Sequence, residues 1–355
     1  MSNAKQALPD WANQMRKVFR SGSISQFILH GAIFDLIPYT GADGTTQLMG
    51  LKQFLEQVML QPFDVVVRYD RGTGIRVVKG LEQVHRFLKT YDEFNGTAYA
   101  KSPASIPRQP DVALWVLDRL LDWCTQHSVI EGNALVRKPF RLAVIVDYVQ
   151  YVAPAGGSLQ MSTNYGNSVI RLLDWANDPA LTEANALTLL LTENLADVNA
   201  SISNNPYSAK LHVPLPKVDE LTRFIEILAE RDPILAKHLK LDASVVASRT
   251  VGLSRVNLRN ALMLAARNGI DIDSEYLAGK RRELIEKECR GLLDFIESTH
   301  TLDEVAGHTE ARKWLREDTA LLKAGNLRSI PMGYLFCGRI GTGKTWLTTC
   351  WAGEI

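Results

Sequence analysis

Residues 338–345 of this chain have the types and the order needed to hold a phosphate group. They read Gly338-Arg339-Ile340-Gly341-Thr342-Gly343-Lys344-Thr345, which fits the pattern G-x-x-x-x-G-K-[ST]. In a loop of this kind the glycines let backbone N–H groups converge on a phosphate, and the lysine reaches the β- and γ-phosphates. The threonine hydroxyl is a ligand for Mg²⁺. The pattern therefore predicts that these residues bind a nucleoside triphosphate, with Thr345 as the metal ligand.

Two elements must position such a loop, a buried strand that leads into it and a helix that leads out. The apolar run at 334–337 predicts the strand, and the residues from Lys344 onward are compatible with the helix. The N-terminus of that helix would bring the positive end of its dipole to the phosphate. Upstream, an amphipathic pattern over 309–323 predicts a further helix.

These segments resemble the start of a AAA-family ATPase module, in a form that FtsH-type proteases share. The resemblance rests on Thr-Leu-Asp-Glu-Val-Ala-Gly-His at 301–308, the helix after it, Ile-Pro-Met-Gly at 330–333 and the loop. It implies that the ligand is ATP with Mg²⁺ and that the backbone of Val305, Ala306 and Gly307 flanks the adenine base. It also implies ATP hydrolysis coupled to protein remodelling in a homo-oligomeric ring.

The composition limits the other classes of function. The chain has 355 residues, enough for two domains, and its 40 basic and 39 acidic residues give a formal charge of +1, which argues against nucleic acid as a partner. No run approaches the roughly 18 apolar residues of a membrane span, and the N-terminus lacks the apolar segment of a secretion signal. The cysteines have no C-x-x-C spacing and are typical of reduced core residues in a cytoplasmic protein: Cys124, Cys289, Cys337 and Cys350.

The first 215 residues alternate between short apolar runs and helical patterns. The runs that predict buried strands are 27–29, 64–69, 142–147, 187–192 and 211–213. The helical patterns between them are 51–60, 112–124 and 168–175. Strands separated by helices predict a parallel five-stranded sheet covered on both faces, and therefore an α/β fold.

This half has the outline of a nucleotide-binding core without the parts that grip a nucleotide. The run at 142–147 ends in Asp147, the form of a strand that contributes an aspartate to a magnesium shell. Tyr148 follows where a glutamate would orient the attacking water, so we favour a loop-capping role for Asp147. No lysine lies between Gly31 and Leu51, and no GK[ST] occurs in this half. Several charge-assisted contacts, each worth about 1.5–3 kcal/mol, would be missing, so we expect no ordinary ATP binding here.

Helical patterns continue after the sheet. Residues 218–228 and 255–267 resemble the helical lid of AAA modules, with Asn257 where Asp is usual, and 274–298 predicts a linker helix. We interpret Arg255 and Arg259 as surface or packing residues, because no phosphate cradle lies beneath them.

The whole arrangement resembles the two-module AAA proteins of cyanobacteria, plastids and other bacteria, in which a degenerate first module precedes an intact second one. The implied fold is a P-loop NTPase-like parallel sheet with a helical lid. The domains expected are an N-terminal tail (1–20), the degenerate α/β core (21–215), the lid (216–270), the linker helix (271–300) and the start of a second module carrying the loop (301–355).

The position of the loop near Ile355 leaves the enzymatic status open. The second module's Walker B acid, sensor and arginine finger do not follow the loop, so hydrolysis by this chain stays undecided. Residues 301–355 either pack on the first module, are ragged, or belong to an interrupted or split sequence whose remainder a partner chain supplies; we expect the last. The alternative function is a non-catalytic scaffold or adaptor with a vestigial loop.

Overall fold

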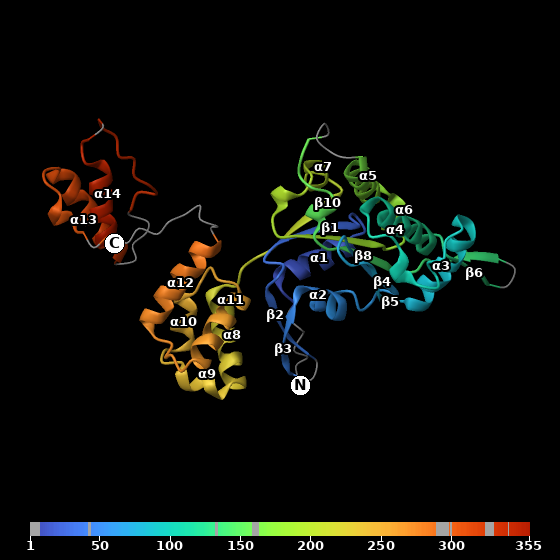
Figure 1. Ribbon diagram of the computed structural model, residues 1–355, viewed down its shortest axis with the longest axis horizontal. Helices are drawn as coiled ribbons and strands as arrows, with labels where there is room; N and C mark the ends of the chain where they lie inside the picture. The colour runs from blue at the N-terminus through green and yellow to red at the C-terminus, as the bar shows by residue number, and fades with distance from the viewer. Residues whose placement is uncertain are drawn as a thin grey trace. The chain divides into compact units, whose positions relative to one another are not determined.

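The computed structural model describes residues 8–41, 44–131, 134–157, 163–288, 298, 300–323, 330–339 and 341–355. The chain divides into two compact units, Met1–Ala278 and Gly279–Ile355, which are described separately (Figure 1).

A six-stranded sheet with the order β10-β1-β9-β8-β4-β5 forms the centre of the first unit. Its five parallel strands confirm the five predicted runs: β1 (Gln26–Gly31), β4 (Val65–Asp70), β8 (Leu142–Val146), β9 (Leu187–Thr192) and β10 (Ser208–Val213). The sixth strand, β5 (Gly74–Lys79), was not predicted and pairs antiparallel with β4 at the sheet edge. β1 lies between β10 and β9, one strand in from the β10 edge of the sheet.

Side chains of the strands alternate between two cores, one on each face of the sheet. Ile28 enters the core formed with α3 (Leu81–Asn95), α4 (Pro110–Thr125) and α5 (Thr163–Asn177). Phe27 and Leu29 enter the opposite core, with α1 (Asp10–Arg20), α2 (Leu51–Phe54) and its π-helical continuation (Leu55–Met59). Helices cover both faces because the strands are apolar on both sides (Figure 1).

Several elements of the first unit were not predicted. The segment expected to be an N-terminal tail contains α1, whose Trp11, Ala12 and Met15 are buried in the core. Two antiparallel hairpins also occur, β2 (Leu36–Thr40) with β3 (Thr46–Gly50), and β6 (Ser128–Glu131) with β7 (Ala134–Arg137). The β2–β3 hairpin follows β1 directly, where a phosphate loop and its helix would otherwise begin. Short helices complete the core: α6 (Pro179–Glu183), α7 (Ala200–Ser203) and the 3₁₀ turns Pro103–Ser105, Val149–Tyr151 and Leu195–Asp197.

A helical lid with its own core follows the sheet. It consists of α8 (Val218–Arg231), α9 (Pro233–His238), α10 (Ala243–Arg249) and α11 (Arg255–Arg267). Leu36 and Leu48 of the β2–β3 hairpin pack against this core, and Arg231 donates a hydrogen bond to the carbonyl of Thr46. α12 (Ser274–Glu288) comes next, and the rest of the expected linker helix, 289–297, lies outside the described residues.

The second unit contains α13 (Thr309–Lys323), α14 (Lys344–Glu354) and a 3₁₀ turn at Leu302–Glu304. Its small core is Leu302, Val305, Leu315, Leu347 and Cys350. The prediction of a strand at 334–337 is wrong: the segment has no strand pairing, and Leu335 is 89% exposed. The described part of this unit offers it no neighbouring strand, and a strand needs a partner for its backbone groups.

One cysteine, Cys337, is not the buried core residue that the sequence predicts. Cys124 and Cys350 are buried, whereas Cys337 is exposed because the segment that carries it is not covered by a sheet. Cys289 lies outside the described residues.

Candidate nucleotide-binding site

The loop residues of the second unit lead directly into the N-terminus of α14. Gly341 and Gly343 have φ values of 85° and 77°, in the left-handed region that glycine adopts without strain. Lys344 Nζ donates hydrogen bonds to the carbonyl oxygens of Gly338 and Arg339, at 2.9 and 2.7 Å. The first turn of a helix has N–H groups without intrahelical partners and the positive end of the dipole. The loop therefore places a lysine and a helix N-terminus together, a combination suited to an anion.

A cavity of about 340 Å³ lies beside this loop. Small-molecule sites are typically about 300–1,000 Å³, so the volume fits a ligand. Its lining includes the aromatic side chains of Trp314 and Tyr334 together with Lys344, a composition that suits a planar base joined to phosphates. The lining residues are His308, Ala311, Trp314, Leu315, Pro331, Gly333, Tyr334, Leu335, Phe336, Cys337, Thr342, Gly343, Lys344 and Leu347.

The residues expected to contact phosphate and metal lie at this cavity or next to it. Thr342, Gly343 and Lys344 line it, and Thr345 is exposed on the first turn of α14. Ile340 lies outside the described residues.

The three residues expected to flank adenine do not line the cavity. Val305 is 4% exposed and packs in the small core, while Ala306 and Gly307 are exposed. The next residue, His308, lines the cavity, and its Nε2 lies 3.2 Å from the carbonyl oxygen of Thr342. His308 was not predicted as a site residue, and no motif marks it; its proximity comes from the turn that precedes α13.

The first unit offers no such cradle at the carboxyl end of β1. The N–H of Gly31 donates to the carbonyl of Glu193, and that of Ala32 donates to the carbonyl of Val213, both at 2.9 Å. A Cβ at Gly31 would lie 2.6 Å from Val213 O and 2.8 Å from the His212 ring. The backbone groups that would face a phosphate are therefore used by neighbouring strands, and the space is filled.

Asp147 of the first unit is held by an arginine in place of a metal ion. Arg68 on β4 donates from Nε to Asp147 Oδ2 at 2.9 Å and from Nη2 to Oδ1 at 2.5 Å, and both side chains are at most 2% exposed. Arg68 also donates to Glu56 at 2.7 Å. Burial disfavours the charged guanidinium, but hydrogen bonds to these two carboxylates outweigh it and hold the pKa of Arg68 above its ordinary value. Asp147 therefore forms a buried ion pair and does not merely cap a loop.

Lys52 and Tyr148 complete this arrangement. Lys52 Nζ lies 3.5 Å from Asp147 Oδ1 and 4.6 Å from the centre of the Tyr148 ring, which in turn lies 5.8 Å from the Phe34 ring. Arg68 and Lys52 balance Asp147 and Glu56 in charge. The sequence held one signal for this cluster, an arginine inside the apolar strand run at 64–69, because a charged residue is buried there only with a partner.

Arg255, expected to be a surface or a packing residue, is the second of these. Its side chain is 10% exposed, and its Nη1 lies 3.5 Å from Asp35 Oδ2 in the segment after β1. Arg255 Nη2 also donates to Glu220 of α8 at 3.1 Å. Arg255 is therefore a packing residue that joins the buried Asp35 of the core to the exposed Glu220 of the lid.

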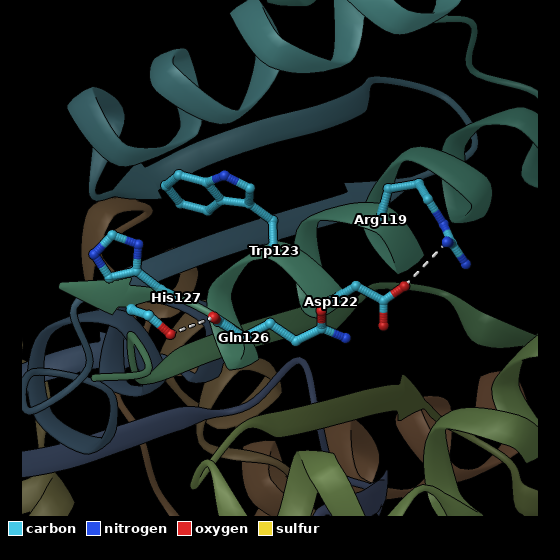
Figure 2. A pocket seen from close by; sticks show the side chains of 6 residues that line it. Arg119, Asp122, Trp123, Gln126 and His127 are labelled. Carbon is cyan, nitrogen blue, oxygen red and sulfur yellow. Dashed lines mark hydrogen bonds and ion pairs between the residues drawn. The ribbon is translucent and has the colours of Figure 1, made fainter. Parts of the chain in front are cut away.

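A second cavity, of about 530 Å³, lies at the C-terminal end of α4 (Figure 2). Its charged groups are paired, because Arg119 contacts Asp122 at 3.1 Å and Asp118 at 2.7 Å. Phe140 N donates to Cys124 O at the end of α4, so the cavity is near the start of β8. That is the amino edge of the sheet, opposite the edge where open α/β sheets bind ligands. We therefore assign it no part in nucleotide binding. It is lined by Arg119, Asp122, Trp123, Gln126, His127 and Ser128.

Comparison with known proteins agrees with this architecture. Residues 2–214 match a family described as AAA+ chaperone, N-terminal Rossmann-like domain, and residues 219–290 match one described as AAA+ chaperone, second helical domain. The first match confirms the α/β fold. A protein of Guillardia theta named "Uncharacterized AAA domain-containing protein ycf46" is 27% identical over 267 residues, which are 73% of this chain and 50% of that protein. The chain therefore spans about half the length of this relative. Among the described residues no helix is both long and apolar enough to cross a membrane.

Proposed function

Because the chain belongs to the AAA+ chaperone family, whose members bind nucleotide, we propose that ATP with Mg²⁺ binds at residues 338–345 of the second unit. The observation that carries this proposal is the 340 Å³ cavity, which is lined by Lys344 at the N-terminus of α14 and by aromatic side chains. We do not expect an ordinary ATP site in the first unit. Arg68 donates two hydrogen bonds to the carboxylate of Asp147, and the backbone N–H groups after β1 are already hydrogen-bonded.

Each loop residue has a role that follows from its chemistry. Lys344 contacts the β- and γ-phosphates, and the backbone N–H groups of the loop and of α14 surround them. The Thr345 hydroxyl supplies one ligand to Mg²⁺, and phosphate oxygens and water supply the others. We place the adenine in the apolar part of the cavity, near His308, which directly follows the turn formed by Val305, Ala306 and Gly307.

Binding requires a local change in the loop. Lys344 Nζ now donates to the carbonyl oxygens of Gly338 and Arg339, and it must leave them to reach a phosphate. A neutral acceptor is then replaced by a charged one, which makes a stronger hydrogen bond. The exchange favours the phosphate-bound position.

The family also suggests how binding is used. AAA+ proteins commonly form oligomers, and we propose that this chain acts in a homo-oligomeric ring in which ATP drives remodelling of a protein client. In this assembly the core (21–215) and lid (216–270) form a degenerate module, the linker (271–300) follows, and residues 301–355 carry the ATP site. A cytoplasmic location stays a prediction from the sequence.

Titration of the full chain with a fluorescent ATP analogue and Mg²⁺ tests the proposal. Lys344→Ala removes charge-assisted contacts worth about 1.5–3 kcal/mol, so the affinity should fall about 10- to 150-fold. Lys313→Ala is the matched control, because this exposed lysine lies on α13 and does not line the cavity. Equal binding by wild type and Lys344→Ala, or no binding by wild type, would contradict the proposal.

A further inference from the structure

Asp35 lies in the part of the first unit that replaces a phosphate loop. Asp35 lies four residues after Gly31. The equivalent spacing in the second unit, counted from Gly338 at the start of its loop, leads to Thr342. Asp35 is 5% exposed. A buried carboxylate is costly unless other groups compensate its charge. The groups around Asp35 therefore show what this side chain does.

Those groups are the ones that bind phosphates in other proteins, a helix N-terminus and an arginine. Val256 N, in the first turn of α11, donates to Asp35 Oδ1 at 3.0 Å. Arg255 Nη1 lies 3.5 Å from Oδ2, an oxygen that accepts no hydrogen bond in the described structure. Arg255 also donates to the carbonyl of Leu36 at 3.3 Å. Arg255 and the first turn of α11 thus form an anion seat on the lid, which the core fills with a carboxylate.

We propose that Asp35 takes the place of a nucleotide phosphate in this seat and holds the lid on the core in one arrangement that is independent of nucleotide. The guanidinium of Arg68 has the complementary role, since it donates hydrogen bonds to both oxygens of the Asp147 carboxylate that would otherwise face Mg²⁺. In the first unit, Asp35 therefore supplies the negative charge that a nucleotide phosphate would bring, and Arg68 supplies the positive charge that Mg²⁺ would bring.

The physical consequence is a fixed first unit. In a lid that closes on ATP, loss of the nucleotide removes the anion that joins lid and core, whereas Asp35 is covalently part of the core and cannot leave. The inference does not rest on ATP binding in the second unit, because each contact it uses lies within residues 31–256.

Hydrogen exchange of the full chain tests it at the amide of Val256. In Asp35→Ala this amide loses its acceptor and α11 loses its anchor, so exchange should become at least about tenfold faster. Inorganic phosphate should slow exchange again in this variant by entering the vacated seat, and should leave the wild type unchanged. Asp35→Asn removes the charge but keeps the volume and an acceptor oxygen, so it should speed exchange at Val256 less than the alanine variant does, and phosphate should have no effect on it because the site stays filled.

Asp232→Ala is the matched control. Asp232 accepts hydrogen bonds from the first-turn amides of α9, at Ile234 and Leu235, and pairs with Arg267, so it has the same chemistry entirely within the lid. Its removal should speed exchange in α9 and leave Val256 unchanged. The proposal is overturned if Val256 exchange is the same in wild type and the Asp35 variants, or if phosphate has no effect on Asp35→Ala. It is also overturned if ATP with Mg²⁺ alters Val256 exchange in the wild type.

Discussion

Asp147→Asn should destabilise the first unit strongly, although it changes one atom of a side chain. The four charges of the cluster now balance, and the substitution leaves Arg68 and Lys52 facing only Glu56. Arg68 is 2% exposed, so water cannot compensate the lost charge. Removal of one partner from a buried ion pair costs about 3–5 kcal/mol.

Calorimetry of the full chain can measure this loss as a shift of the first unit's melting transition. At roughly 2 °C or more per kcal/mol for a unit of this size, the transition should move down by at least about 6 °C. Asp64→Asn is the control, because Asp64 and Arg141 form an exposed pair 3.6 Å apart on the same unit, worth at most about 1 kcal/mol. Arg68→Met combined with Asp147→Asn removes both buried charges and should be less destabilised than Asp147→Asn alone.

The opposite interpretation makes a different prediction. If Asp147 were a magnesium ligand, Asp147→Asn would lower affinity for ATP with Mg²⁺ and leave the melting transition of the nucleotide-free protein almost unchanged. A shift below about 1 °C together with weaker ATP binding would refute the reasoning.

Three further predictions concern histidines and a cysteine. His308→Ala removes a contact to Thr342 O, so affinity for a fluorescent ATP analogue should fall about fivefold, and unchanged affinity would exclude a positioning role. ATP with Mg²⁺ should protect Cys337, which is exposed and lines the cavity, from N-ethylmaleimide in site-resolved mass spectrometry, and equal labelling would place the nucleotide elsewhere. Burial, a neighbouring imidazole and a nearby lysine lower the pKa of His30 below 6.5. The unfolded chain therefore binds this proton more readily, and stability should decline as pH falls through about 6.5. His30→Gln should weaken that decline in melting curves, and an unchanged decline would assign it to other groups.

The local pattern of the chain was enough for the five parallel strands, for the loop and for most of the longer helices, although α1 and α3 were missed. The run at 187–192 became β9 with the same bounds, and the patterns at 255–267 and 309–323 became α11 and α13. The strands β4, β8 and β9 are buried along their whole length, so their runs are mostly apolar and can be recognised without their neighbours. The glycines and Lys344 are recognisable because the loop's chemistry is contained in consecutive residues.

Elements that depend on a partner were predicted poorly. The apolar run at 334–337 has the composition of a strand, but without neighbouring strands in the described second unit it stays unpaired. The β2–β3 hairpin was missed because Pro38 lies within its first strand and a polar stretch, 40–47, runs from the end of β2 into β3, which gives a weak strand pattern.

Only the tertiary structure decided how the first unit's charged side chains are used. Arg68 and Asp147 are 79 positions apart, and Asp35 meets the N-terminus of α11 across 221 positions. Arg68 indicates a buried partner because it lies inside an apolar run, but the two carboxylates look ordinary in their local segments, since a carboxylate after a strand is compatible with a metal ligand, a helix cap or an ion pair. The choice among them depends on which opposite charge the fold brings within hydrogen-bond distance after both groups leave water, and local spacing carries no information about that partner.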